Sequence, residues 1–414
     1  MPWCIMSFGT VGTDVMERIN WARMREERKQ KALQAMKEAG LGAILTMYEE
    51  NIRYVSATHG PEWTKTIPGL RCALILADGD VVVYEQGDNR YHIMRHCPWL
   101  KKENVRYAYT WTKGAAGPAN EHQAKKLITS VLNYMKEHGV ADLPLGVDFA
   151  DINMLKVFKE LNVNWTDGLK PLLEARAVKT DDEIEALKIA AAIADAAHYE
   201  ATRILRPGIR ENEVIAHLMK YVMSIPGVEH IENFICCSGP NSWPNWRTFT
   251  DRMIRYGDLV LIDLVLVWNG YFTCHYRTYC VGRQPTKEQR EAYQQAYDWL
   301  YEAIKAIRPG ITTREIAMKW PTAKEVWGYE SEDEAAANLW GHGLGLSHYD
   351  LPVISRIFSL DYPYPIKKNM FFAVETQQGK MFEWGTRIEE EVLVTDTGYE
   401  VVTKCPSEEI IVVG

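Results

Sequence analysis

Four ionisable side chains lie inside or beside strongly apolar segments, where their charge needs compensation. Asp263 interrupts the run LVLIDLVLV, and Glu375 lies in the equally apolar MFFAVETQ. Glu389 precedes EEVLVT, and His342 lies in the glycine-rich WGHGLGLSHYDLP. A buried carboxylate is costly unless it is paired, hydrogen-bonded or bound to a metal. Carboxylates with an imidazole form a ligand set for Mn, Fe, Co or Zn. The alternative is that the four residues form separate salt bridges or face outward into solvent.

The composition limits the classes of protein to which the chain can belong. Its 414 residues are 47% hydrophobic and 25% charged, with a formal net charge of −8, so we expect a globular protein and no nucleic-acid partner. No apolar run approaches the roughly 18 residues that span a bilayer, and the first residues do not resemble a signal peptide. The 8 cysteines are scattered without a CxxC pair, which favours reduced thiols in a cytoplasmic protein.

The chain length favours two domains, which we place at residues 1–168 and 169–414. In the first, we predict helices over 18–40 and 121–137, strands over 41–48, 51–57 and 143–149, and a hairpin over 72–85. In the second, the segment 204–214 is similar to the segment 306–316, and each follows a predicted long helix. Strands are expected over 259–268, 270–281, 370–375 and 389–395. This pattern predicts a duplicated half and a pseudo-two-fold α+β domain.

The segments with the four ionisable residues resemble those of the pita-bread metallopeptidase and creatinase superfamily, which includes Xaa-Pro aminopeptidase, prolidase and creatinase. GDLVLIDLVLVWNGYFTCHYRTYCVG resembles its first ligand segment, GHGLGLSH its histidine segment, and FFAVET and RIEEEVLVTDTGYE its glutamate segments. The resemblance implies a pita-bread catalytic domain, with a pseudo-two-fold αβ repeat around an antiparallel sheet, after a creatinase- and prolidase-type N-terminal α/β domain. It also implies a homodimer, with metal ligands at Asp263, His342, Glu375 and Glu389.

The chain departs from the family pattern at two positions. Alignment on Arg277 and Thr278 places Cys274 where the family has its second metal-ligating aspartate. A thiolate can bind Zn or Fe but does not bridge two hard ions. We therefore expect one divalent metal (Fe, Zn or Mn), or a metal-free site. Only one of Cys274 and His275 can readily point inward. Peptidases and creatinase carry a histidine at about the place of Asn245, and an amide cannot be a general base.

One branch of the superfamily, dimethylsulfoniopropionate lyase, fits better. NIRYVSATHGPEWTKTIPGLRCALILADGDVVVYE and HIENFICCSGPNSWPNW resemble segments of that enzyme, which forms acrylate and dimethyl sulfide from a sulfonium zwitterion. Its base is an aspartate six residues after the ligand histidine. Here that position holds His348, and Asp350 lies two residues further on. An imidazole titrates near neutrality, so His348 and Asp350 are the candidate catalytic residues, although a lone histidine is more often structural.

A small zwitterionic substrate needs an aromatic face for its cation and an arginine for its carboxylate. Arg71 and Arg277 are the candidate carboxylate clamps, with a structural ion pair as the alternative for Arg277. Aromatic rings bind sulfonium or ammonium groups well, although the same rings can belong to the core or a dimer interface. Five aromatic residues lie in or near the matching segments: Trp63, Trp243, Trp246, Tyr271 and Trp384.

Together these features predict a lyase that removes the α proton of a small zwitterion and eliminates a leaving group. The first alternative is a creatinase-like or Xaa-Pro-peptidase-like hydrolase of a C–N bond, with a water activated by the metal or by His348. The second is a catalytically inactive binding module. The missing aspartate and histidine support that alternative, whereas the retained His342, Glu375 and Glu389 argue against it.

Overall fold

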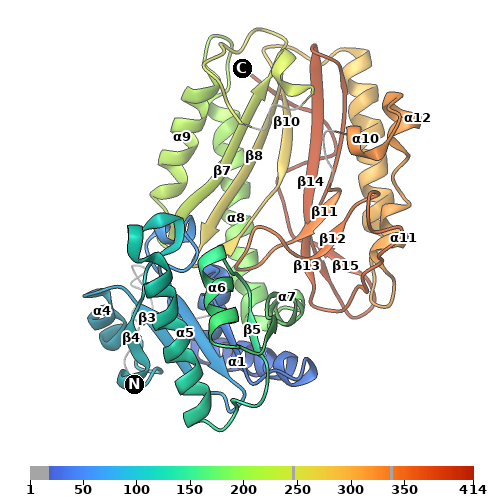
Figure 1. The fold of residues 1–414 in the computed structure, drawn as a ribbon. Coiled ribbons are helices and arrows are strands. Elements are labelled where there is room, and N and C mark those ends of the chain that lie inside the picture. Colours follow the sequence, from blue (N-terminus) through green and yellow to red (C-terminus); the bar gives the residue numbers. More distant parts are fainter. Residues whose placement is uncertain (1–17, 245–247, 336–338) are drawn as a thin grey trace.

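The computed structural model describes residues 18–244, 248–335 and 339–414. A six-stranded sheet with its helices lies at one end of the molecule, and two five-stranded sheets backed by long helices form the other end (Figure 1). The predicted boundary falls at Gly168, directly before helix α7 (Leu169–Ala177); the division into two domains there stays a prediction. Among the described residues, no helix has the length and apolar character needed to cross a membrane.

The six-stranded sheet has the order β4-β3-β2-β1-β5-β6 and contains parallel and antiparallel pairs. The predicted hairpin is confirmed, with β2 and β3 joined at Gly79. The strands of the six-stranded sheet are β1 (Ala43–Thr46), β2 (Cys72–Leu76), β3 (Val81–Glu85), β4 (Val105–Tyr107), β5 (Leu145–Val147) and β6 (Trp165–Asp167). Its helices are α1 (Trp21–Glu38), α2 (Glu49–Ser56), α3 (Glu62–Lys65), α4 (Asn89–His96), α5 (Asn120–Glu137) and α6 (Ile152–Glu160).

The strand predicted over 51–57 is wrong, because this segment lies in helix α2. Alternating apolar residues in a short segment do not distinguish a strand from a buried helix. Glu49 and Glu50 lie in the first turn of α2, where carboxylates interact favourably with the helix dipole. Ala57 then ends the helix in the left-handed conformation. The α2 helix packs beside the sheet and carries Asn51, which takes part in the polar network described below.

The duplicated half predicted from the sequence is confirmed, since each copy is a set of helices followed by the strands of one five-stranded sheet, the last strand of the first sheet coming from the end of the chain. The first sheet has the order β16-β10-β8-β7, with β9 beside β8, and the second has the order β12-β11-β13-β14-β15. The first copy contains α8 (Asp181–Ile204), α9 (Glu211–Met223), β7 (Val228–Ser238), β8 (Leu259–Trp268), β9 (Tyr271–Phe272) and β10 (Tyr276–Val281). The second contains α10 (Lys287–Ala306), α11 (Thr313–Ala317), α12 (Ala323–Trp327), β11 (Gly341–Gly343), β12 (Asp350–Ile354), β13 (Phe371–Lys380), β14 (Trp384–Val394) and β15 (Tyr399–Val401), and β16 (Ile411–Val413) returns to the first sheet.

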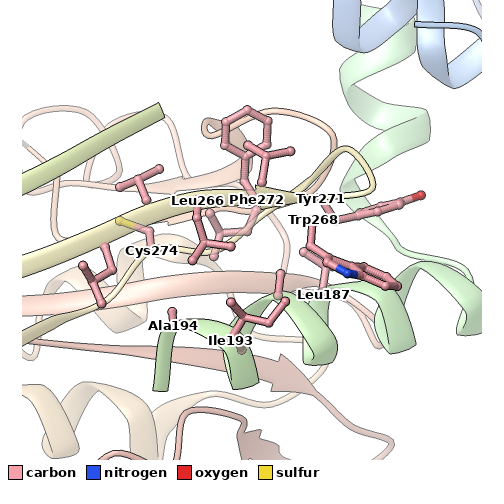
Figure 2. Close-up of a cluster of buried hydrophobic side chains, with 14 of the residues drawn as sticks. Leu187, Ile193, Ala194, Leu266, Trp268, Tyr271, Phe272 and Cys274 are labelled. Atoms are coloured by element: carbon pink, nitrogen blue, oxygen red, sulfur yellow. The ribbon is translucent and has the colours of Figure 1, made fainter. Parts of the chain in front are cut away.

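Helix α8 fixes the position of the first sheet. Its start carries a capping box, in which Thr180 and Glu183 satisfy each other's backbone N–H groups. Its apolar face, including Leu187 and Ile193, packs against side chains of β8 and β9 such as Leu266 (Figure 2). Burial of each large apolar side chain stabilises the fold by about 1.5–3 kcal/mol. The helix therefore holds β8 in place, and with it the carboxylate of Asp263.

The strand predicted over 270–281 is interrupted. Strand β9 ends at Phe272 and β10 begins at Tyr276. Between them, Thr273 still donates its backbone N–H to the carbonyl of Leu266 in β8 at 3.2 Å. Glu391 of β14 accepts hydrogen bonds there from the hydroxyl of Thr273 and from the backbone N–H of Cys274 (2.9 Å). This contact between the two sheets fixes the backbone at Cys274, whose sulfur lies at the edge of the apolar cluster in Figure 2.

Candidate active site and metal centre

A cavity of about 290 Å³ is lined by residues from both five-stranded sheets. It brings together the five residues predicted as metal ligands and the predicted base His348. The lining residues are Asn233, Ile235, Asp263, Cys274, Tyr276, Leu339, His342, His348, Tyr349, Glu375, Arg387 and Glu389.

Strand pairing places the carboxylates and the imidazole. Glu375 of β13 stands directly opposite Glu389 of β14 in an antiparallel hairpin. His342 of β11 stands opposite Ala373, on the other edge of β13. Asp263 of β8 comes from the first sheet, where it pairs with Tyr276 of β10. The cavity is thus built where the two halves of the duplication meet.

The thiol of Cys274 lies at the centre of the ligand cluster. Its Sγ is 3.6 Å from Oδ1 of Asp263 and 3.5 Å from Oε2 of Glu389. Cys274 belongs to two groups whose possible ligand atoms lie within 4.8 Å of one another, one with Asp263 and Glu389 and the other with His342 and His348. Of the neighbours Cys274 and His275, Cys274 lines the cavity, and the ring of His275 packs 4.6 Å from that of His198 instead.

The charges of the cluster are poorly compensated by the protein itself. Burial raises the pKa of Asp263 well above its ordinary value, and the nearby Glu389 raises it further. Burial likewise raises the pKa of Glu389, and the carboxylate of Glu375 adds to the effect. Oε1 of Glu389 is buried and has no hydrogen-bond partner within the described residues. These features fit a divalent cation held by Asp263, Cys274, His342 and Glu389, a mixed donor set that suits Zn or Fe. Glu375, the fifth predicted ligand, lines the same cavity and is paired with Arg387.

Arg387 is a charged residue of the site that the sequence analysis missed. Its Nε donates to Oε2 of Glu375 at 2.7 Å, and its Nη2 donates to the same oxygen. Its guanidinium lies 4.2 Å from the ring centre of Tyr276. The alternation of side chains along a strand offered the signal, because Arg387 precedes Glu389 by two residues and so shares its face.

His348 lies next to the ligand cluster. Its ring centre is 5.1 Å from that of His342, and its Nε2 is buried without a hydrogen-bond partner in the described part of the chain. Burial lowers the pKa of His348 to about 3, and His342 contributes to the shift. The imidazole is therefore neutral at pH 7. A pKa this low makes it a weak base in the protein without metal or substrate, so its candidacy as the base rests on the position of its unpartnered Nε2.

Asp350, the second predicted catalytic residue, is an ion-pair partner in the structure. Its carboxylate accepts from Nη2 of Arg176 at 2.7 Å and from Nζ of Lys179 at 3.1 Å. Nη1 of Arg176 also donates to Asn51, whose Nδ2 donates to Asp148 at 2.9 Å. Burial alone would raise the pKa of Asp350, but the two cations lower it below its ordinary value. Asp350 therefore anchors the loop that carries His348 to α7 and, through Asn51, to α2.

The substitution Asp350→Ala should destabilise the protein strongly. It leaves the charges of Arg176 and Lys179 buried without their partner, and breaking such a pair costs about 3–5 kcal/mol. The free energy of unfolding, measured by urea denaturation, should fall by that amount. Asp361→Ala removes an exposed aspartate nearby and should change it by less than about 0.5 kcal/mol. Equal stability of the two variants would contradict the anchoring role.

The two arginines predicted as carboxylate clamps have structural partners. Arg71 is 2% exposed and pairs with Glu49 at 2.7 Å and Glu85 at 2.8 Å. Arg277 donates to the carboxylate of Glu390 at 2.9 Å and to the backbone carbonyl of Glu389 at 2.7 Å. Their guanidinium groups are used within the fold, so the expected role as clamps is corrected to that of structural ion pairs.

The predicted aromatic residues that the structure describes, Trp384 among them, lie outside the lining of the cavity. Tyr271 is buried and donates to Oε1 of Glu183 at 3.2 Å. Trp243 is buried against Trp327, with ring centres 5.7 Å apart, whereas Trp63 is 52% exposed. None of these three lines the cavity as far as the structure describes it. Trp246, the remaining aromatic candidate, lies outside the described residues. So does Asn245, the position at which peptidases and creatinase carry a histidine. The aromatic rings that do line the cavity are those of Tyr276 and Tyr349.

Two helix-backed sheets that meet at an acidic, histidine-containing cavity define the pita-bread class of proteins. The family model of metallopeptidase family M24 matches residues 185–396, about half of the chain. The protein belongs to metallopeptidase family M24, whose members are enzymes that typically bind divalent metals. This confirms the predicted superfamily and fold.

Several relatives and solved structures are similar to the chain. It is 31% identical over 248 residues to the probable dipeptidase PepE of Mycobacterium tuberculosis, and the match covers 60% of this chain and 63% of that protein. It is 24% identical to dimethylsulfoniopropionate lyase DddP of Roseovarius nubinhibens, over 97% of this chain and 90% of the relative. The crystal structure of Mycobacterium ulcerans PepE has a TM-score of 0.75 at 23% identity, covering 95% and 99% of the chains, which shows a shared fold.

Proposed function

We propose that the protein is a metal-dependent lyase that cleaves a small zwitterion by removal of the α proton and elimination. The observation that carries the proposal is the buried Nε2 of His348, which has no hydrogen-bond partner among the described residues and lies beside the ligand cluster in one cavity. The volume of about 290 Å³ is at the lower end of ligand pockets, which span about 300–1,000 Å³. It favours a substrate the size of a substituted propanoate.

The proposed reaction needs one base and a leaving group. Nε2 of His348 accepts the proton from the carbon next to the carboxylate of the substrate. The electron pair of that C–H bond forms a carbon–carbon double bond, and the C–S or C–N bond breaks. Its electron pair leaves with a neutral sulfide or amine. When a divalent metal is bound by Asp263, Cys274, His342 and Glu389, it supplies a Lewis acid that stabilises negative charge on the substrate carboxylate.

Two features support an elimination of this type. The similarity to the lyase from Roseovarius nubinhibens extends over almost the whole chain. The aromatic ring of Tyr349 lines the cavity, and a sulfonium or ammonium group is attracted to such a ring; the ring of Tyr276 already lies against the guanidinium of Arg387.

Product analysis tests the proposal directly. The purified protein, supplied separately with Zn, Fe(II) and Mn(II), is incubated with dimethylsulfoniopropionate and with its trimethylammonium analogue. We expect an alkenoic acid and a free sulfide or amine, detected by NMR and gas chromatography. A hydrolytic product without an alkene would overturn the elimination and favour the second candidate function.

The second candidate function is hydrolysis of a C–N bond. The chain is 27% identical to the Xaa-Pro dipeptidase of Pyrococcus furiosus over 92% of its length and 99% of that protein. In this case His348 would take a proton from the attacking water. Release of free amino acids from an Xaa-Pro dipeptide, with no alkene from either zwitterion, would support it.

A further inference from the structure

A second group of polar atoms lies on the β13–β14 hairpin, beside the ligand cluster. Gln377 of β13 stands directly opposite Arg387 of β14, two positions along from the opposed Glu375 and Glu389. Residues two apart on a strand share a face, so all four side chains lie on one face of the hairpin. Glu375, Arg387 and Glu389 line the cavity, and Gln377 lies beside Arg387 just beyond that lining. Gln377 is 1% exposed and Arg387 is 4% exposed.

The guanidinium of Arg387 has one unused edge. Its Nε and Nη2 both donate to Oε2 of Glu375, and its flat face lies over the ring of Tyr276. Its Nη1 is buried and has no hydrogen-bond partner in the ranges that the structure describes. The ion pair and the ring hold the group in one orientation, so the Nη1 edge is presented in a fixed direction.

The amide of Gln377 is also unused. Both Nε2 and Oε1 are buried without a hydrogen-bond partner among the described residues. Buried polar groups are nearly always paired in native proteins, so two such groups on opposed residues need an explanation. A guanidinium N–H and an amide N–H on one face can donate to the two oxygens of a carboxylate.

We propose that Nη1 of Arg387 and Nε2 of Gln377 bind the carboxylate of the substrate. The inference rests on the proposed function and deepens it, since it assigns the anionic group of the zwitterion to Arg387 of the cavity and its cross-strand neighbour Gln377 instead of Arg71 and Arg277. Glu375 already offsets part of the charge of Arg387. The charge of Arg387 alone therefore attracts a carboxylate only weakly, and the hydrogen bond from Gln377 is needed for selective binding.

Binding of propanoate to the full-length, metal-loaded protein tests the inference without any turnover. Affinity is measured by calorimetry for the wild type and for Gln377→Glu, with propanamide as an uncharged ligand of the same shape. The variant loses a donor and places a like charge beside the ligand. We expect its affinity for propanoate to fall at least about tenfold, the loss of one hydrogen bond to a charged group. Binding of propanamide should change far less.

Gln378→Glu is the matched control, because it makes the same change at the adjacent residue. The amide of Gln378 is already engaged, with Trp327 at 2.9 Å and Gln295 at 2.9 Å. Its affinity for propanoate should stay within about twofold of the wild type. If Gln377→Glu disturbs folding, Gln377→Met removes the donor without a charge and should still weaken binding about fivefold.

Two results would overturn the inference: no binding of propanoate to the wild type, or equal weakening by Gln377→Glu and Gln378→Glu. The protein could bind propanoate in a way that depends on Gln377 and yet form no alkene from any zwitterion. That pair of results would uphold the carboxylate site and overturn the proposed lyase activity. The two proposals can therefore fail independently.

Discussion

His342→Ala should abolish both metal binding and turnover. The substitution removes the imidazole whose Nε2 lies 3.7 Å from Oε1 of Glu389, at the centre of the cavity. Loss of a partner that only orients a metal ligand already costs about 10–100-fold in metal affinity or activity, so loss of a ligand should cost more. Mass spectrometry of the purified protein should find about one metal per chain in the wild type and almost none in the variant.

The matched control is His122→Ala, which removes an exposed histidine on α5. This variant should keep the metal content and the turnover of the wild type. Unchanged metal content in His342→Ala would refute the proposed ligand set. A wild type that holds no metal, even after reconstitution, would instead favour a metal-free mechanism of the creatinase type, centred on His348.

His348→Asn should lower turnover and leave the metal content intact. A positioned general base contributes about 10²–10⁴-fold to the rate, and an amide cannot accept the proton. The substitution keeps a polar side chain of similar reach, so the loop should retain its fold. Turnover should fall by that factor, and the wild type should show a primary isotope effect with substrate deuterated next to its carboxylate.

A loss of metal in His348→Asn would change the assignment of this residue. The ligand atoms of Cys274, His342 and His348 lie within 4.8 Å of one another, so His348 would then be a metal ligand and another group would be the base. Normal turnover with normal metal content would exclude both roles. His122→Asn serves as the control for the same chemical change on the surface.

The sequence predicted the elements of the site well, because strong local signals marked them. A carboxylate within an apolar strand, as at Asp263 and Glu375, indicates a compensated buried charge wherever that strand packs. The glycine-rich segment around His342 and the duplicated half provided further signals. The structure places these segments at one cavity, although the role of each residue as a ligand stays a prediction.

The partners of the arginines could not be predicted, because they depend on contacts between distant segments. Arg71 is paired with Glu49 and Glu85, and nothing in the neighbouring sequence of Arg71 distinguishes a substrate clamp from such an ion pair. Asp350 is bound by Arg176, which lies far away in the sequence. Ion pairs of this kind follow from the tertiary fold, so sequence reasoning listed the right residue types and assigned some to the wrong partners.

The polar network from Asp148 through Asn51 and Arg176 to Asp350 has a consequence for the evolution of this protein. Three of its contacts join the six-stranded sheet, α2, α7 and the loop of His348. A recombination that exchanges residues 1–168 for those of another family member would leave Arg176 facing a foreign side chain at the position of Asn51. The N-terminal segment and the loop of His348 must therefore be inherited together or change by compensating substitutions. A functional chimera would have to carry residues at positions 51 and 148 that match Arg176 and Asp350.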